Sequence, residues 1–303
     1  GWDGPGYGLL KATGSGEHGV AAGHDGHGGS LLYPSGTRGR RAGAVRMRWK
    51  WMVVAAVLVV AGAGVAYWRL RGPVPVDVVS KAEALARIEG LVTAGRGGRV
   101  FTPNVDHVVL AHRDEALRRA YARAELCTAD GAPLVFLSRL SPAPLPERVA
   151  GADVVEPVVA RAAERGWPLF LLGGGPGVAD EAAARWKSRY PRLAVAGTAA
   201  PRVSAVPTAE QVERAAELVR AAAPRIVLVA LGAPKQELFI DALAALLAPA
   251  VLLGVGAALD FVAGRVRRAP AFVSRVGAEW LFRLAQEPRR LAHRYLVRDA
   301  TFP

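Results

Sequence analysis

Hydrophobic positions downstream of residue 76 form short apolar runs that alternate with longer amphipathic segments. The runs are bounded by glycine and proline, and they predict strands at residues 99–102, 167–172, 193–195, 225–231 and 250–255. The amphipathic segments predict helices at residues 78–92, 108–124, 178–189, 208–222 and 238–247. Strands that alternate with helices predict an α/β fold with a Rossmann-like, mostly parallel sheet and flanking helices.

The beginning of the chain lacks this pattern. Residues 1–46 are rich in glycine, with scattered histidine and serine. They cannot bury enough apolar surface to fold, so we expect them to be disordered. Met47 is the first methionine and stands directly ahead of an apolar run. We therefore interpret residues 1–46 either as a misassigned, over-extended start or as an artificial addition to the native protein.

An uncharged run at residues 51–68 carries aromatic side chains at both ends. Its length matches the thickness of a bilayer, and basic residues flank it. It predicts one transmembrane helix within an anchor at residues 47–71, followed by a proline-containing linker at 72–76. A cleaved signal peptide is the alternative, because small residues at 61–63 could be a cleavage site. Basic residues lie on both sides of the run, so charge does not decide its orientation.

The formal charge is +13 and the isoelectric point is about 10.7, which favours an anionic partner: nucleic acid, anionic lipid or a phosphorylated substrate. Much of this charge lies in residues 265–303, where arginines interleave with aromatic and aliphatic residues. Such a basic helical appendage suits a membrane lipid surface. A helix packed on the domain with a solvated charged face is the alternative. No nucleic-acid-binding motif is present, so we expect no nucleic-acid partner. Cys127 is the single cysteine, which excludes a disulfide within the chain.

Polar residues follow the predicted strands, where an α/β sheet binds its ligands. Asp130 follows an apolar approach at 124–129, and partial burial there would raise its pKa and make it a usable base. Capping of the next helix, or an Asx-turn, is the alternative. Other candidates for ligand binding at strand ends are Gly173, Gly174, Lys235, Gln236 and Asp260. The glycine turn could bind an anion through backbone N–H groups, or it could simply be a tight turn.

Several segments together resemble one family. They are the Thr-Pro-Asn-Val-Asp-His block at 102–107, Thr-Ala-Asp-Gly at 128–131, the block at 146–153, the glycine turn at 172–177, Ala-Leu-Gly-Ala-Pro-Lys-Gln-Glu at 230–237, the block at 254–264, and the tail with Glu-Trp-Leu-Phe-Arg-Leu at 279–284. In order and spacing they are similar to the WecG/TagA/CpsF glycosyltransferases, over residues 76–298. The fused span before residue 76 departs from the family pattern.

The resemblance implies an inverting glycosyltransferase of cell-surface polysaccharide or teichoic acid biosynthesis. The donor would be a UDP-sugar carrying N-acetylmannosamine, its uronic acid or glucose. The acceptor would be a polyprenyl-diphosphate-linked saccharide. The family has no Asp-x-Asp metal motif, and this chain has none either, so no metal or other cofactor is expected. The catalytic domain, residues 77–264, would then face the cytoplasm at the cell membrane, and a homo-oligomer is left open.

The resemblance also implies roles for individual residues. Asp130 matches the proposed general base, and Thr102 and Asn104 match the pocket residues beside it. Arg148 matches an arginine that meets phosphates, and Gln236 matches a glutamine of the donor pocket. Two arginines of the tail, expected to reach the acceptor diphosphate, are Arg283 and Arg290.

Two other classes of protein are alternatives to a glycosyltransferase. A nucleotide-dependent oxidoreductase would need a Gly-x-Gly-x-x-Gly turn after its first strand and an acidic residue further on, and neither is found. A non-catalytic protein that binds lipid, nucleotide or nucleic acid would explain the basic tail. It does not explain why polar residues gather at the predicted strand ends.

Overall fold

The computed structural model describes residues 72–270, 273, 279–288 and 291. The predicted disordered segment, the predicted anchor at 47–71 and Arg290 lie outside these residues. Within the described part of the chain, no helix has both the length and the apolar character needed to cross a membrane.

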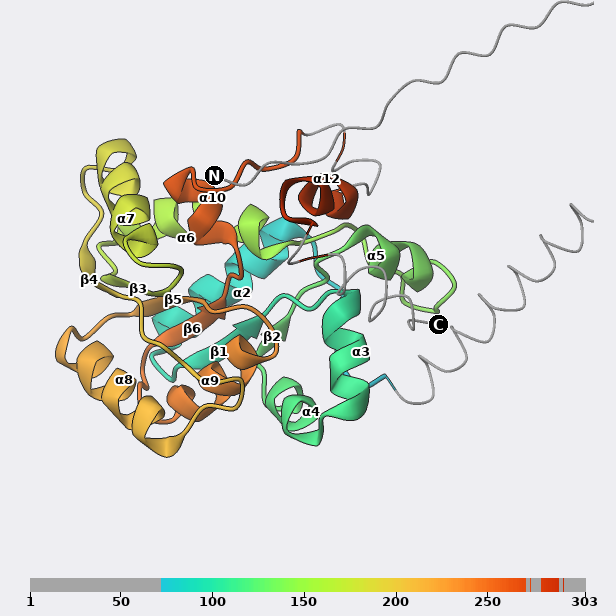
Figure 1. Ribbon diagram of the computed structural model, residues 1–303, viewed down its shortest axis with the longest axis horizontal. Helices are drawn as coiled ribbons and strands as arrows, with labels where there is room; N and C mark the ends of the chain where they lie inside the picture. Colours follow the sequence, from blue (N-terminus) through green and yellow to red (C-terminus); the bar gives the residue numbers. More distant parts are fainter. Residues whose placement is uncertain (1–71, 271–272, 274–278, 289–290, 292–303) are drawn as a thin grey trace, which may run out of the picture. The chain divides into compact units, whose positions relative to one another are not determined.

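The core is one parallel sheet of six strands in the order β2-β1-β6-β5-β3-β4 (Figure 1). Every recorded pairing between neighbouring strands is parallel. The strands are β1 (Gly98–Phe101), β2 (Leu126–Cys127), β3 (Leu169–Gly173), β4 (Val195–Ala199), β5 (Ile226–Ala230) and β6 (Val251–Gly254). The predicted Rossmann-like parallel sheet is confirmed, and a further short strand, β2, leads to Asp130.

Helices cover both faces of the sheet, as Figure 1 shows. One face packs against α2 (Lys81–Ala94), α6 (Gly151–Arg165), α7 (Val178–Arg189) and α10 (Ala258–Ala263). The other packs against α3 (Val105–Arg113), α4 (Glu115–Ala122), α8 (Ala209–Ala221) and α9 (Lys235–Ala244). Two further helices are α5 (Ala132–Ser138) and α12 (Glu279–Gln286).

Alternate residues of each central strand enter opposite cores. In β5, Ile226 and Leu228 join the core under α2, α6, α7 and α10, whereas Val227 and Val229 join the other. All four side chains are fully buried. A strand buried on both faces has no polar side to show, which is why β5 reads as an unbroken apolar run in the sequence.

Several helices differ from the predictions: α9 begins and ends three residues earlier than predicted, α5 and α10 were not predicted, and two further differences have a clear local cause. The helix predicted at 108–124 is two helices, because Asp114 ends α3 and its side chain accepts a hydrogen bond from the N–H of Leu117 (3.0 Å) to cap α4. The second correction concerns α6, which the sequence pattern did not predict. Pro157 lies inside it, and a proline ordinarily argues against a helix interior.

Candidate active site

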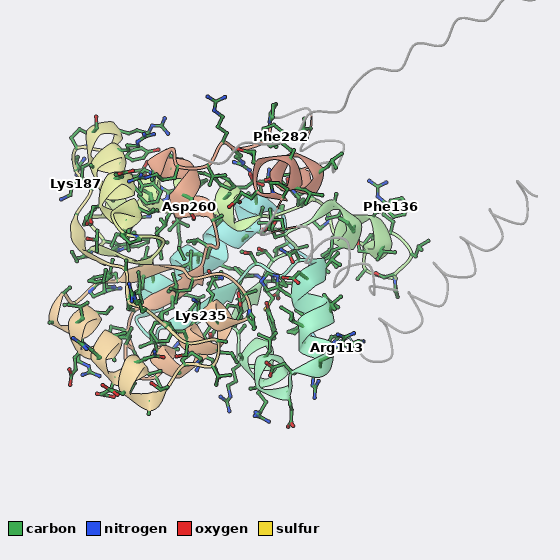
Figure 2. The ribbon with its side chains drawn as sticks, in the orientation of Figure 1. Arg113, Phe136, Lys187, Lys235, Asp260 and Phe282 are labelled. Atoms are coloured by element: carbon green, nitrogen blue, oxygen red, sulfur yellow. The ribbon has the colours of Figure 1, made fainter. Side chains whose placement is uncertain are left out.

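A pocket of about 920 Å³ lies at the carboxyl ends of the strands. Residues that follow all six strands line it, so it is the crevice expected for ligands in a parallel α/β sheet. Figure 2 shows two of its polar residues, Lys235 from α9 and Asp260 from α10, at this end of the sheet. The loop after β4 contributes Arg202 and its neighbours.

Asp130 lines this pocket three residues beyond the end of β2. Its backbone N–H donates to the carbonyl of Pro103 (2.8 Å), and the N–H of Val149 donates to the carbonyl of the preceding Ala129 (2.9 Å). The following helix, α5, is capped by Gly131 without any side-chain hydrogen bond. Asp130 is therefore not a helix cap, and its carboxylate is on the wall of the cavity.

The surroundings of Asp130 raise the pKa of its carboxyl group to about 6. Burial is the largest cause, because a charged carboxylate is poorly solvated there. Arg148 and His107 act in the opposite direction, and Glu279 and Asp153 add to the rise. A carboxyl group with such a pKa is ionised near neutral pH, yet it is basic enough to accept a proton from a hydroxyl.

Arg148 stands at the same end of the pocket, just before α6. Its Nη1 donates to Oε2 of Glu279 in α12 (2.8 Å), and its Nη2 donates to Oδ2 of Asp153 in α6 (3.1 Å). Asp153 also pairs with Arg268, beyond α10. These four alternating charges hold the start of the C-terminal appendage against the catalytic domain, and they bring Glu279 into the pocket wall.

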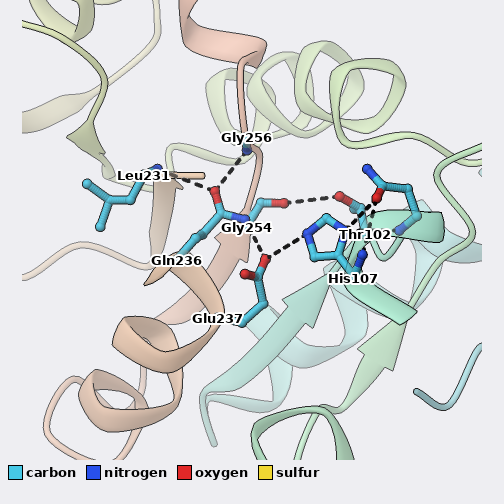
Figure 3. A network of polar contacts seen from close by, with 8 residues as sticks. Thr102, His107, Leu231, Gln236, Glu237, Gly254 and Gly256 are labelled. Carbon is cyan, nitrogen blue, oxygen red and sulfur yellow. Dashed lines mark hydrogen bonds and ion pairs between the residues drawn. The ribbon is translucent and has the colours of Figure 1, made fainter. Parts of the chain in front are cut away.

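A polar network lies between the ends of β1, β5 and β6 (Figure 3). The side-chain oxygen of Gln236 accepts hydrogen bonds from the N–H groups of Gly256 (2.9 Å) and Leu231 (3.4 Å). Its amide nitrogen donates to Oε1 of Glu237 (2.9 Å). Glu237 Oε1 also lies 3.5 Å from Nε2 of His107. Gln236 lines the pocket but is 3% exposed, and both ends of its amide contact the protein itself.

Asn104 and Thr102 belong to the loop that follows β1, and both line the pocket. Asn104 is the N-cap of α3, and its side-chain oxygen accepts from the N–H of His107 (3.4 Å). The hydroxyl of Thr102 donates to the carbonyl of Gly254 (3.4 Å). Thr102 thereby joins β1 to β6.

The two glycines predicted to bind substrate differ. Gly174 lines the pocket, but Gly173 is not among the lining residues. Gly173 has φ 108°, and a Cβ there would lie 2.3 Å from the carbonyl oxygen of Ala230 in β5. Close packing of β3 against β5 therefore explains why glycine occupies position 173.

The other predicted site residues lie in different parts of the structure. Lys235 and Asp260 line the pocket. Arg283 lies in α12, and only its position along that helix is described. Sequence reasoning missed three residues: His107, Glu237 and Glu279. His107 and Glu237 stand beside predicted site residues, three positions after Asn104 and one after Gln236, and that adjacency was the available signal.

Among residues 72–270 and the described parts of the tail, no three histidine, cysteine, aspartate or glutamate side chains are grouped to hold a metal ion. The model of the Glycosyl transferase WecG/TagA/CpsF family matches residues 71–303. That match takes in the whole sheet, the pocket and α12. The chain therefore belongs to the Glycosyl transferase WecG/TagA/CpsF family, a group of glycosyltransferases in cell-surface polysaccharide synthesis.

Proposed function

We propose that this protein transfers a sugar from a UDP-sugar to a polyprenyl-diphosphate-linked saccharide, with inversion at the anomeric carbon. The donor sugar is N-acetylmannosamine, its uronic acid or glucose. The observation that carries the proposal is Asp130, a carboxyl group whose pKa is raised to about 6, on the wall of a pocket that also contains Arg148 and Lys235. When a hydroxyl displaces a diphosphate leaving group, a base must take the hydroxyl proton and cations must stabilise the charge of the leaving diphosphate.

The reaction is a single displacement. Asp130 takes the proton of the acceptor hydroxyl while that oxygen attacks the anomeric carbon. The bond between this carbon and the UDP oxygen breaks, and UDP leaves with the electron pair. Attack on the face opposite the leaving group inverts the anomeric centre, and Asp130 returns the proton to solvent.

Charge on the leaving UDP is met by protein groups in this proposal. Lys235 is in the first turn of α9, and Gly175 lines the pocket just before the start of α7. The N–H of Gly174 is not assigned to phosphate, because it donates to the carbonyl oxygen of Ala230 (2.6 Å). Cations and helix N-termini both favour bound phosphate. The enzyme is accordingly proposed to be independent of metal ions. Arg148 is proposed to contact phosphate after it exchanges partners, because Glu279 and Asp153 now occupy its guanidinium.

A lipid-linked acceptor requires the catalytic domain to work at a membrane. The apolar run at 51–68 and the basic residues of 265–303 support this placement. We propose a single-pass protein of the cell membrane with its catalytic domain on the cytoplasmic side, where UDP-sugars are available.

The test is acceptor-dependent release of UDP by the full-length protein. Polyprenyl-diphosphate-N-acetylglucosamine and a panel of UDP-sugars are supplied, with and without EDTA. Asp130→Asn is expected to lower the rate by roughly 10² or more, because it removes the base. Asp114→Asn is the matched control: Asp114 caps α4 away from the pocket, and asparagine caps a helix about as well as aspartate.

Release that survives EDTA, requires the acceptor and is lost in Asp130→Asn supports the proposal and names the donor. Equal rates in Asp130→Asn and Asp114→Asn would remove Asp130 from the mechanism. UDP binding without release for any donor would favour a non-catalytic nucleotide-binding protein.

A further inference from the structure

His107 is a buried polar residue for which the proposed mechanism has no role. Its side chain lines the pocket and is only 8% exposed. It is in the first turn of α3, three residues after the N-cap Asn104. Its ring is nearly perpendicular to that of Tyr121 in α4, with ring centroids 6.4 Å apart. Buried polar side chains need partners, and the partners of His107 come from two different strand ends.

The two ring nitrogens of His107 face different groups. Nε2 lies 3.5 Å from Oε1 of Glu237, in α9. Nδ1 lies 3.1 Å from the backbone nitrogen of Asn104 and 2.8 Å from its side-chain oxygen. The N–H of Asn104 can donate to Nδ1 when this nitrogen is unprotonated, and the oxygen can accept from it when it is protonated. The imidazole therefore contacts Asn104 through Nδ1 and Glu237 through Nε2.

In the contact between His107 and Glu237, the Glu237 side chain is held in place by its surroundings. It is 1% exposed, and its Oε1 also accepts from the amide of Gln236 (2.9 Å). Gln236 is in turn held by the N–H groups of Leu231 and Gly256. A Cβ at Gly254 would lie 2.6 Å from the Gln236 amide nitrogen, so this amide is also confined sterically. Contacts from the ends of β5 and β6 thus reach the imidazole through two buried side chains (Figure 3).

The far end of the network is next to the proposed base. Asn104 precedes α3 in the loop whose Pro103 carbonyl accepts the N–H of Asp130 (2.8 Å). The Cβ position of Gly131 lies 3.7 Å from Cβ of Asn104. Among the groups that set the pKa of Asp130, His107 acts to lower it. Asp130, Asn104 and His107 therefore line the same part of the pocket.

We propose that His107 and Glu237 are a positioning pair: Glu237 holds the imidazole through Nε2, and the imidazole fixes Asn104 and supports Asp130 electrostatically. The inference rests on the proposed function, because it assigns the pair to the base of that reaction. Through Gln236, the pair joins the loops that follow β5 and β6 to the part of the pocket that carries Asp130.

Several charged or titratable groups from other elements face these residues and enter any pH dependence. Around His107 they are Glu237 from α9 and Tyr121 from α4; around Asp130 they are Arg148, Asp153 from α6 and Glu279 from α12. His107 shares α3 with Asp106, a buried carboxylate that also lines the pocket, and it contacts Asn104. Its replacement is therefore the cleanest perturbation of Asp130 that leaves the ion pairs of Arg148 in place.

The experiment compares three variants of the full-length protein in the UDP-release assay. His107→Asn keeps a polar group near Nδ1 but falls short of Glu237; His107→Gln reaches the position of Nε2 but leaves Nδ1 empty; and Glu237→Gln removes the charge alone. Each is expected to lower kcat by about 10 to 10², with little change in KM for the donor, because misplacement of a reacting group acts on the chemical step. The acidic limb of the pH profile is expected at higher pH in both His107 variants.

His112→Asn is the matched control, because His112 is in the same helix but does not line the pocket. The proposal is overturned if the three variants keep the kcat and the acidic limb of this control. Rates that fall only in proportion to lost folded protein, measured by circular dichroism, would also overturn it.

A second readout separates this inference from the proposed function. The carboxyl carbon of Asp130 is followed by ¹³C NMR as pH is varied, with its signal assigned by its loss in Asp130→Asn. This titration needs no turnover. A midpoint at higher pH in His107→Gln than in His112→Asn supports the electrostatic part of the proposal even if no donor is turned over. Equal midpoints contradict it even if the enzyme is active.

Discussion

Arg148 and Glu279 form a 2.8 Å ion pair between residues 131 positions apart in the chain. The pair joins the loop ahead of α6 to α12 of the C-terminal appendage, and both residues line the pocket. Its consequence is electrostatic as well as mechanical. Arg148 lowers the pKa of Asp130, and Glu279 raises it. The appendage therefore influences the proposed base although it follows the α/β domain in sequence.

Glu279→Gln tests that influence. Removing the carboxylate removes one cause of the raised pKa of Asp130, so we expect the acidic limb of kcat/KM to move to lower pH. The Arg148 and Glu279 side chains are 21% and 19% exposed, and Arg148 keeps Asp153, so the variant should lose only about 1 kcal/mol of unfolding free energy in urea. Glu213→Gln, on the exposed surface of α8, serves as the control. An unchanged limb would show that the appendage does not act on Asp130.

The wild-type pH profile should report Asp130 directly. With a pKa of about 6, the carboxylate is the reactive form and is progressively protonated below that pH. As far as Asp130 is concerned, we expect kcat/KM to be constant above about pH 7 and to fall about tenfold per pH unit well below pH 6. The measurement is initial UDP release in buffers of constant ionic strength. A limb near pH 4, the ordinary range of an aspartate, would contradict the environment described for Asp130.

The same pKa shift makes a prediction about stability. A carboxyl group with a pKa higher in the folded state than its ordinary 3.8 binds its proton more tightly when folded. Its contribution therefore destabilises the fold as pH rises from about 4 to 6, and the full cost is present above 6. Asp130→Asn should remove this cost and stabilise the protein at pH 8 by up to about 3 kcal/mol. Near pH 4 the effect should be small.

Thermal unfolding of Asp130→Asn and wild type at pH 4.5 and pH 8 checks this difference, and Asp114→Asn is measured alongside. A higher Tm at pH 8 combined with lost transfer would identify Asp130 as a residue kept for activity at the expense of stability. An equal or lower Tm at pH 8 would contradict the raised pKa.

Gly173→Ala should be strongly destabilising. A Cβ would lie 2.3 Å from the Ala230 carbonyl oxygen, which belongs to the adjacent strand β5 and cannot move aside easily. The positive φ of 108° adds backbone strain. We expect a loss of about 3 kcal/mol or more in urea unfolding. Gly175→Ala is the matched control two residues later, because its nearest contact would be an ordinary 3.7 Å to Val178. Similar losses in both variants would refute the close-packing role of Gly173.

The repeating elements were predictable because burial leaves a pattern in the sequence. Strand β5 is buried on both faces, and its apolar run located it within one residue at each end. Helix α7 was predicted with its observed bounds, between the glycine turn and Tyr190. Asp130 was also predictable as a candidate, because a carboxylate between two apolar segments and beside a glycine stands out. The family resemblance supplied the role of that carboxylate.

Prediction from hydrophobic spacing failed where a single side chain decides whether a helix ends or continues. Asp114 divides the predicted helix at 108–124 by capping a new one, and Pro157 is accommodated inside α6. Such choices depend on a few hydrogen bonds and on packing against the sheet, and hydrophobic spacing does not record them.

The sequence alone determined the α/β class, the two-sided burial of the central strands and the gathering of polar residues at their ends, because each follows from local patterns of apolar and polar positions. Only the tertiary structure decided which of those polar residues meet. In the tertiary structure Glu279 pairs with Arg148, the amide of Gln236 hydrogen-bonds within the protein, and Glu237 contacts His107. Contacts of this kind join residues from separate strand ends, and their geometry depends on strand order and helix placement, which the spacing of residues along one chain does not specify.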